Sequence, residues 1–220
     1  MNALVTLVGL VVALGGFEAV SRVQDALDRP EDSLEEHAWK WLVPAAVAGY
    51  VLVVEDAALA SIGWTFPGTV PFAYYTAVGL AAMLATTVLL APVRERMDSA
   101  DEMNEGLAEF AAFSIPQRFA VAATAGVTEE VPYRGYTIER VAALTGSPLL
   151  GAAVSLVAFL WAHVGDRWST GAALQMAQPT LVLLALYLWT RSLPVVIAVH
   201  GVWDAFGLLF ADQAAEQTGA

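Results

Sequence analysis

Long apolar segments alternate with short polar stretches along most of the chain. Seven segments are apolar, and most of them are long enough to cross about 30 Å of hydrocarbon as a helix. They are Ala3–Val20, Trp41–Ile62, Val70–Val93, Ser114–Arg134, Pro148–His163, Thr170–Arg191 and Leu193–Ala211. A further helix is added if the stretch from Pro132 to Leu144 re-enters the membrane. The pattern predicts an all-α fold, a polytopic membrane helical bundle of about seven to eight transmembrane helices.

The amino-acid composition points the same way. Of the 220 residues, 58% are hydrophobic and 15% are charged. With the 17 glycines added, about two-thirds of the chain is apolar, where about half is usual for a soluble domain. A soluble protein of this length cannot hide so much apolar surface, and a disordered chain would not contain it. We therefore expect an integral, multi-pass membrane protein.

The net charge is −12, and the chain has no cysteine. The charge argues against nucleic acid as a partner, and the lack of thiols excludes disulfides and cysteine nucleophiles. Twelve of the 22 acidic residues lie in two polar stretches, Ser21–Lys40 and Arg94–Phe113. Such stretches are typical of solvated loops, and the alternative is an acidic surface adapted to a salty interior. We expect the plasma membrane of a prokaryote with an acidic proteome.

Several ionisable residues lie inside the apolar segments, where each costs about 2.5–3.5 kcal/mol unless it faces a partner or a wet cavity. They form three motifs: Glu129-Glu130-x-x-x-Arg134, Phe159-x-x-x-His163 and His200-x-x-x-Asp204. In each motif the residues four apart share a face of a helix. The spacing predicts that Arg134 pairs with Glu130, which leaves Glu129 free for another task.

These residue types limit the chemistry. The sequence has no Gly-x-Ser-x-Gly and no His-Glu-x-x-His, which excludes a serine hydrolase of that type and a zincin. One carboxylate and two imidazoles from three helices can hold and deprotonate a water molecule, with or without a metal ion. Asp204 would orient His200 or act on a developing oxyanion.

Together the three motifs resemble those of the CPBP intramembrane protease family, which includes the type II CAAX prenyl endopeptidases and Abi-like immunity proteins. The resemblance covers about residues 114–210. It implies that Glu129 activates water with His163 as its partner, and that His200 and Asp204 stabilise the oxyanion. The remaining motif residues, Glu130, Arg134 and Phe159, would be structural or would position the substrate.

The best-known prenyl proteases carry Asn where this chain has Asp204. An ionised Asp would repel an oxyanion, so we expect Asp204 to be protonated or paired with His200. The resemblance leaves the metal question open. Glu129, His163 and His200 would make a three-ligand zinc site with an open fourth position, and a glutamate-activated water needs no metal.

The resemblance implies an intramembrane endopeptidase acting on a membrane-anchored protein or lipidated peptide, such as a prenylated CAAX protein, in the lipid bilayer. Residues 1–113 would supply N-terminal transmembrane helices, and residues 114–212 a CAAX-protease/Abi-like catalytic core, within one structural domain. Two alternatives remain. A non-catalytic immunity or assembly partner of the same fold would be expected to lose a polar motif residue. A proton-relay transporter would be expected to show paired half-chains, but the unusual residues lie in the second half.

One acid pair has no place in these motifs. Glu55 and Asp56 lie near the end of the second apolar segment, Trp41–Ile62. We expect them to reach the membrane interface, and a contact with entering substrate or a cation is the alternative.

Overall fold

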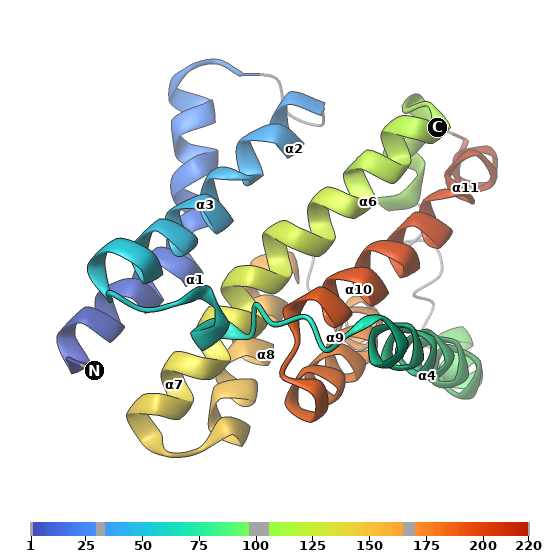
Figure 1. Ribbon diagram of the computed structural model, residues 1–220. Helices are drawn as coiled ribbons and strands as arrows, with labels where there is room; N and C mark the ends of the chain where they lie inside the picture. Colours follow the sequence, from blue (N-terminus) through green and yellow to red (C-terminus); the bar gives the residue numbers. More distant parts are fainter. Residues whose placement is uncertain (1, 30–33, 97–105, 165–169, 220) are drawn as a thin grey trace.

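The computed structural model describes residues 2–29, 34–96, 106–164 and 170–219, and these ranges form helices and connecting turns without a β-strand (Figure 1). The helices are α1 (Ala3–Ala26), α2 (Leu34–Lys40), α3 (Leu42–Gly49), η1 (Tyr50–Val54), η2 (Leu59–Ile62), α4 (Thr69–Glu95), η3 (Glu109–Ala112), α6 (Ile115–Glu130), η4 (Val131–Thr137), α7 (Ile138–Thr145), α8 (Pro148–Val164), α9 (Thr170–Thr190), α10 (Leu193–Leu208) and α11 (Ala211–Thr218). The segments η1 and η4 are π-helical, and η2 and η3 are 3-10 helices. The predicted all-α fold is confirmed.

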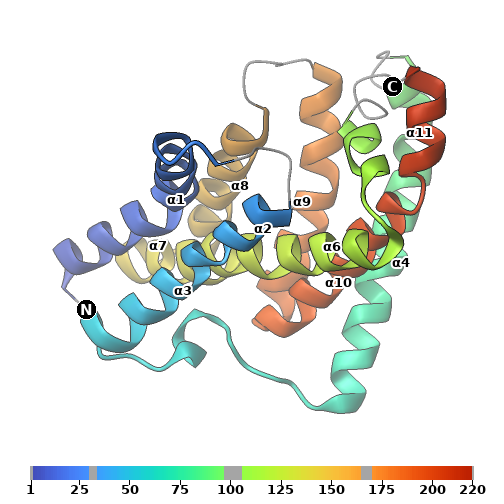
Figure 2. The ribbon, with the colours of Figure 1, turned by 90° about the horizontal axis from the view of Figure 1, so that it is seen from above.

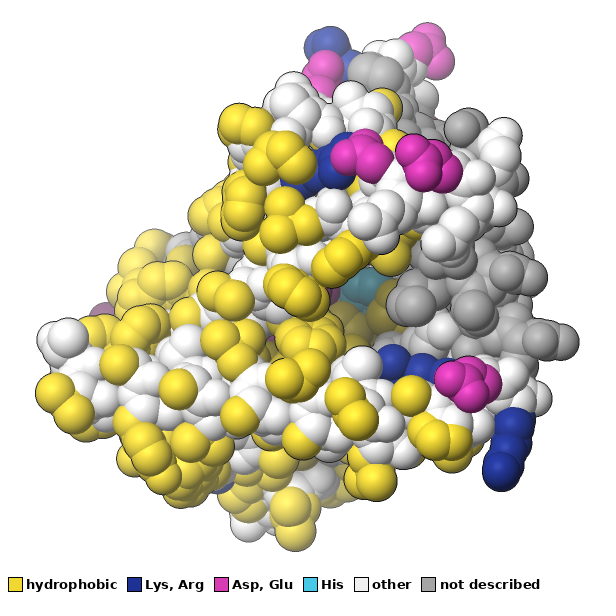
Figure 3. All heavy atoms as spheres, turned by 90° about the vertical axis from the view of Figure 1, so that its right-hand side faces the viewer, with side chains coloured by type: hydrophobic (Ala, Val, Ile, Leu, Met, Phe, Trp, Pro, Cys, Tyr) yellow, Lys and Arg dark blue, Asp and Glu magenta, His cyan; other side chains and the backbone are white. Residues whose placement is uncertain are grey.

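Four helical segments of the described chain are long and apolar enough to cross a membrane: Ala3–Ala26, Leu34–Val54, Thr69–Glu95 and Ala173–Thr190. A fifth is added if α10 and α11, which meet at a bend of 43°, count as one span. The predicted count of seven to eight is not confirmed: α8 has only 17 residues, and α6 contains several polar and charged side chains. Large apolar side chains point outward, as on the face that carries α4 (Figure 3). The chain is an integral membrane protein.

The helix that was predicted to end near Arg134 continues without interruption to Thr145. Its α-helical first part, α6, passes directly into the π-helical turn η4 and then into α7. Pro132 explains the change, because it has no N–H to donate to the carbonyl one turn earlier. The hydroxyl of Thr137 donates to the carbonyl of Pro132 at 2.8 Å. The stretch after Pro132 therefore extends a helix instead of forming a separate re-entrant one, and every residue of η4 is buried.

Helices α6 and α10 lie side by side along most of their lengths (Figures 1 and 2). Gly126 makes this close approach possible. A Cβ at that position would lie 3.0 Å from the carbonyl oxygen of Ile197 and 3.2 Å from the backbone nitrogen of Gly201. Both neighbours are backbone atoms of α10, so the two helices would have to separate to admit a larger residue.

The N-terminal helices pack against η4 from the other side. The phenol of Tyr136 fits against Gly9 so closely that a Cβ on Gly9 would lie 1.7 Å from its Oη. The rings of Phe17 and Tyr133 stack with centroids 6.1 Å apart. The π-helical turn is thus enclosed by α1 and α3 as well as by α6, α8 and α10.

Glu55 forms a buried ion pair that was not predicted from the sequence, and its place at the membrane interface stays a prediction. Its side chain is fully buried and faces Arg140 of α7, which is 3% exposed. Arg140 donates to the Glu55 carboxylate from Nε at 2.9 Å and from Nη2 at 2.6 Å, and Tyr136 Oη donates to it at 2.7 Å. Arg140 also donates to the carbonyl and the hydroxyl of Ser61. The exposed Asp56 follows with a φ of 50°, where the chain turns away.

Arg118 connects the start of α6 to the C-terminal helix. It is 3% exposed and donates to the carbonyls of Phe113 and Leu208, and to both carboxylate oxygens of Asp212 on α11. Four of the eight residues of α11 are Asp, Glu or Gln, so we place this helix outside the hydrocarbon. The Arg118 guanidinium beside Asp212 holds the pKa of that carboxyl below its usual range.

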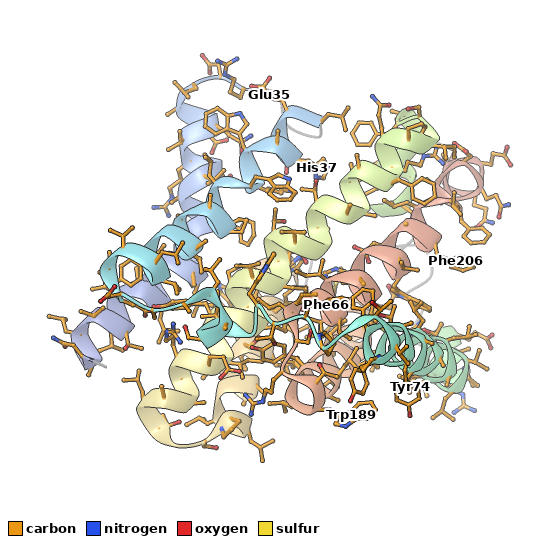
Figure 4. All side chains as sticks on the ribbon, in the orientation of Figure 1. Glu35, His37, Phe66, Tyr74, Trp189 and Phe206 are labelled. Atoms are coloured by element: carbon orange, nitrogen blue, oxygen red, sulfur yellow. The ribbon has the colours of Figure 1, made fainter. Side chains whose placement is uncertain are left out.

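Aromatic side chains gather where α4 begins and α9 ends. Figure 4 shows Tyr74 and Trp189 close together at this end of the molecule, with ring centroids 6.5 Å apart. Tyr75 is 4.9 Å from the same indole. Trp189 is 55% exposed and Tyr74 58%. Exposed aromatic rings of this kind are typical of a membrane–water interface, so this end of α4 and α9 lies at one bilayer surface.

Candidate active site

The three motifs converge in space although they lie on separate helices. Glu129 and Glu130 end α6, His163 lies near the end of α8, and His200 and Asp204 share one face of α10. The contact of α6 with α10 brings the carboxylates to His200, and the packing of α8 against η4 brings His163 to the same place. All seven predicted site residues belong to one cluster.

Glu129 lies between the two imidazoles. Its Oε1 is 3.6 Å from His163 Nε2, and its Oε2 is 3.8 Å from His200 Nε2. Both distances exceed a direct hydrogen bond and suit groups that share a bridging water. The side chain of Glu129 is 19% exposed and that of His163 27%, so both can be reached from outside.

His163 is oriented by the residue one turn before it. Its Nδ1 lies 2.8 Å from the Phe159 carbonyl oxygen, which can only accept, so Nδ1 carries the proton. This leaves Nε2 to face Glu129. The imidazole also stacks on the Phe159 ring with centroids 4.0 Å apart. Phe159 in turn lies 4.3 Å from the guanidinium carbon of Arg134 and 5.2 Å from the ring of Tyr133.

The Glu130–Arg134 pair predicted from the spacing is present and fully buried. Arg134 Nη1 lies 3.1 Å from Glu130 Oε1. The same oxygen lies 2.7 Å from His200 Nδ1. Among the described residues, the remaining oxygen of Glu130 and the nitrogens of Arg134 have no hydrogen-bond partner, so the contact between the two side chains is an ion pair. Glu130 therefore fixes the orientation of His200 by a hydrogen bond, while Arg134 balances its charge.

Asp204 is paired with His200, one of the two arrangements expected for an acid at this position. Its Oδ2 lies 3.2 Å from His200 Nε2, and its side chain is 34% exposed. The imidazole of His200 thus has a carboxylate at each nitrogen: Glu130 at Nδ1 and Asp204 at Nε2. Glu129 lies slightly further from Nε2 than Asp204 does.

Residues 111–206 match a family model described as type II CAAX prenyl endopeptidase Rce1-like. This segment is an Rce1-like domain. It includes all seven motif residues and runs from the end of η3 through most of α10. No curated protein and no solved structure gives a significant match to the chain. Membership of the domain in this family implies a protease that acts on membrane-protein substrates.

The described side chains of the Rce1-like domain were compared with the donor set that a zinc ion needs. Glu129, His163 and His200 offer oxygen and nitrogen donors of the kind that zinc accepts. In the described part of the chain, however, no group of three or more His, Asp or Glu side chains converges closely enough to hold a metal ion. The zinc site stays a prediction, which a chelator can test.

One contributor to the site was missed in the sequence. Tyr133 is 1% exposed and connects Phe17 of α1 to Phe159 of the second motif through ring contacts. Its position four residues after Glu129 was the available signal, since residues at that spacing share a helix face. An apolar segment with a single tyrosine is common, so the pattern alone does not distinguish such a residue from ordinary core.

Proposed function

We propose that this chain is an intramembrane endopeptidase that hydrolyses a peptide bond of a membrane-anchored protein, with a prenylated CAAX-type protein as the candidate substrate. The Glu129 carboxylate between the two Nε2 atoms, at 3.6 and 3.8 Å, carries this proposal. We propose as its setting the plasma membrane of a prokaryote with a salt-adapted proteome, on the basis of the acidic loops.

The first step is the activation of water. A water held between Glu129 and His163 gives a proton to the carboxylate, and its oxygen attacks the carbonyl carbon of the scissile bond. Because Nδ1 of His163 is committed to the Phe159 carbonyl, Nε2 is the atom that orients this water. Glu129 then passes the proton to the leaving amine as the C–N bond breaks, which leaves the carboxylate ionised for the next cycle.

The second requirement is stabilisation of the oxyanion. An ionised carboxylate only accepts hydrogen bonds, so a carboxylate at each ring nitrogen requires His200 to carry both protons. Its Nε2–H, shared with Asp204 in the resting enzyme, turns toward the oxyanion as negative charge develops there. Glu130 and Arg134 hold the ring in place from the buried side. Asp204 thereby acts through His200 and has no need to donate a hydrogen bond itself.

The test is cleavage of membrane-anchored peptides, with lipidated and unlipidated C-termini, by protein reconstituted in liposomes. We expect wild type to cleave and Glu129→Gln to fold normally but lose turnover by a factor of at least about 10². Glu109→Gln, which changes an exposed acid on η3, is the matched control and should cleave like wild type. Cleavage that persists in Glu129→Gln would remove this residue from its role.

A strong chelator added to the same reactions separates the two forms of the mechanism. Loss of activity that zinc restores would establish the three-ligand metal site. Activity that survives the chelator would establish a water activated by Glu129 and His163 alone. If no peptide of either kind is cleaved, a non-catalytic membrane partner of the same fold becomes the better description.

A further inference from the structure

A groove of about 450 Å³ lies between α4 and α9, on the surface of the molecule. We name it the α4–α9 groove. Its lining is apolar apart from Thr86 and Gln178, and it includes the exposed side chains of Leu89 and Leu181. Both helices belong to segments that are long and apolar enough to cross the membrane, so the groove opens toward lipid. The described residues that line it include none of the seven motif residues.

The position of the groove in the bilayer follows from the aromatic side chains at one end of it. Tyr74 and Trp189 mark one bilayer surface (Figure 4). Arg94 lies on the same helix as Tyr74, twenty residues further along. Twenty residues of helix rise by about 30 Å, which is the thickness of the hydrocarbon core. Arg94 therefore lies at the opposite surface, at the depth of the lipid phosphates.

The length of the groove matches one leaflet. Along α4 its lining runs from Val78 to Leu90, the residue one turn before Arg94. Twelve residues of helix rise by about 18 Å, and one leaflet contributes about 15 Å of hydrocarbon. An acyl chain that starts beside Arg94 can therefore lie in the groove down to the middle of the bilayer.

A chain of hydrogen bonds holds Arg94 at the end of the groove. Nη2 of Arg94 donates to Oε1 of Gln178, which is 5% exposed and lines the groove. Nε2 of Gln178 donates to the Thr86 hydroxyl at 2.6 Å, and that hydroxyl donates to the Ala82 carbonyl at 2.7 Å. Since the hydroxyl proton is used in this way, Thr86 accepts from the amide nitrogen. The amide oxygen of Gln178 is thereby kept toward Arg94.

The charge of Arg94 is not balanced by the residues that hold it. Gln178 is neutral, and in the described part of the chain Arg94 forms no ion pair. Its Nε is buried without a hydrogen-bond partner, and Nη1 makes no hydrogen bond to a described residue. A guanidinium presents its donors as a planar fork that matches the oxygens of a phosphate. Located at the depth of the lipid phosphates, this side chain is suited to bind one.

A phospholipid fits the groove better than a helix of another protein does. An apolar helix would cover the lining but would leave the charge of Arg94 without a partner. A phospholipid supplies an apolar chain for the groove and a phosphate for Arg94. The groove between α6 and α10 is lined by apolar side chains only, and so it has no corresponding place for a phosphate.

We propose that the α4–α9 groove binds a phospholipid, with an acyl chain between the two helices and the phosphate on Arg94. Helix α4 packs against α9 and α10 and precedes the Rce1-like domain, to which both of those helices contribute. The lipid thereby attaches α4 to the domain. This site is separate from the catalytic cluster and does not depend on the proposed protease activity.

The experiment compares phosphatidylglycerol with diacylglycerol, which has the same acyl chains and no phosphate. Each is titrated into the purified protein in detergent, and bound lipid is counted by native mass spectrometry. We expect phosphatidylglycerol to bind about tenfold more tightly, equivalent to about 1.4 kcal/mol, and to raise the melting temperature. Arg94→Gln should remove both the preference and the rise in melting temperature. Arg96→Gln is the matched control, because Arg96 is exposed and does not line the groove, and it should keep both.

A second pair of variants tests the groove itself. Ala185→Phe fills the groove from its exposed side and should weaken the binding of both lipids. Ala77→Phe changes an exposed residue of α4 outside the groove and should leave binding unchanged. Equal binding of the two lipids by wild type would overturn the proposal, and so would a preference that survives Arg94→Gln. If Ala185→Phe has no effect, or if inorganic phosphate displaces phosphatidylglycerol, Arg94 binds phosphate alone and the groove is not a lipid site.

Discussion

Replacing Glu55 should destabilise the protein strongly, although the residue lies outside the catalytic cluster. Its side chain is fully buried and Arg140 is 3% exposed, so neither charge is solvated by water. Glu55→Ala removes the acceptor for three of the hydrogen bonds donated by Arg140 and for the one donated by Tyr136. Among the described residues, the guanidinium then keeps hydrogen bonds to Ser61 alone.

Removing one partner of a buried ion pair costs about 3–5 kcal/mol, because the other charge stays buried without compensation. The free energy of unfolding of a folded domain is about 5–15 kcal/mol, so this substitution removes a large part of it. The control is Glu18, which forms an exposed ion pair with Arg22. The side chain of Glu18 is 65% exposed and that of Arg22 is 75% exposed. Glu18→Ala should cost less than about 1 kcal/mol.

The assay is thermal unfolding in detergent micelles, followed by tryptophan fluorescence, with the three proteins purified identically. A third variant removes both buried charges, Glu55→Leu with Arg140→Met, and should regain part of the lost stability. If Glu55→Ala unfolds at the same temperature as Glu18→Ala, the buried Glu55–Arg140 pair contributes no more to the free energy of unfolding than the exposed pair does. Failure of the double variant to recover would locate the effect in packing instead of charge.

Two further predictions concern the packing of α6. Gly126→Ala should lower the rate of peptide cleavage, because a Cβ there pushes α10 away from Glu129. Gly207→Ala is the control and should leave the rate unchanged, because a Cβ at that position meets nothing within 4 Å. Equal rates in the two variants would show that the distance between α6 and α10 does not limit cleavage. Because Arg118 holds the pKa of Asp212 below its usual range, the stabilisation from this pair is fully present above the unfolded pKa of about 4 and is lost as the pH falls through the folded value. The difference in melting temperature between wild type and Asp212→Asn should therefore stay constant from pH 8 to 5 and shrink below about pH 4; a difference that persists at pH 2 would contradict it.

Much of the site follows from short spacings in the sequence. Glu130 and Arg134, and His200 and Asp204, are four residues apart, and in each case the pair is in contact in the structure. Helix geometry fixes such pairs locally, whatever the rest of the chain does. The convergence of separate helices could be expected because isolated ionisable groups are too costly inside a membrane.

Contacts between distant segments could not be read in this way. Glu55 lies 85 residues before Arg140, and the hydropathy of its own segment places it at a helix end near the surface. Nothing in a single sequence pairs the two. The predicted number of spans is not confirmed for a different reason: α6 carries polar side chains that serve the site, and α8 has only 17 residues.

The N-terminal half does more than anchor the chain, because it holds the π-helical turn that follows the catalytic carboxylates. Gly9 provides the test. Gly9→Ala would place a Cβ 1.7 Å from Tyr136 Oη, and since Tyr136 is fully buried its ring cannot move aside without giving up its hydrogen bond to Glu55.

We therefore expect Gly9→Ala to lower the melting temperature, and its effect to be smaller in a protein that already carries Glu55→Ala, because both changes act on the same bond. Gly15→Ala, also on α1 but with nothing within 4 Å of a Cβ, should have little effect in either background. Effects of Gly9→Ala and Glu55→Ala that simply add would mean that α1 and the buried pair support the turn independently. A shortfall from additivity would show that α1 and Glu55 act on the turn through Tyr136, and so through a part of the chain that precedes the Rce1-like domain.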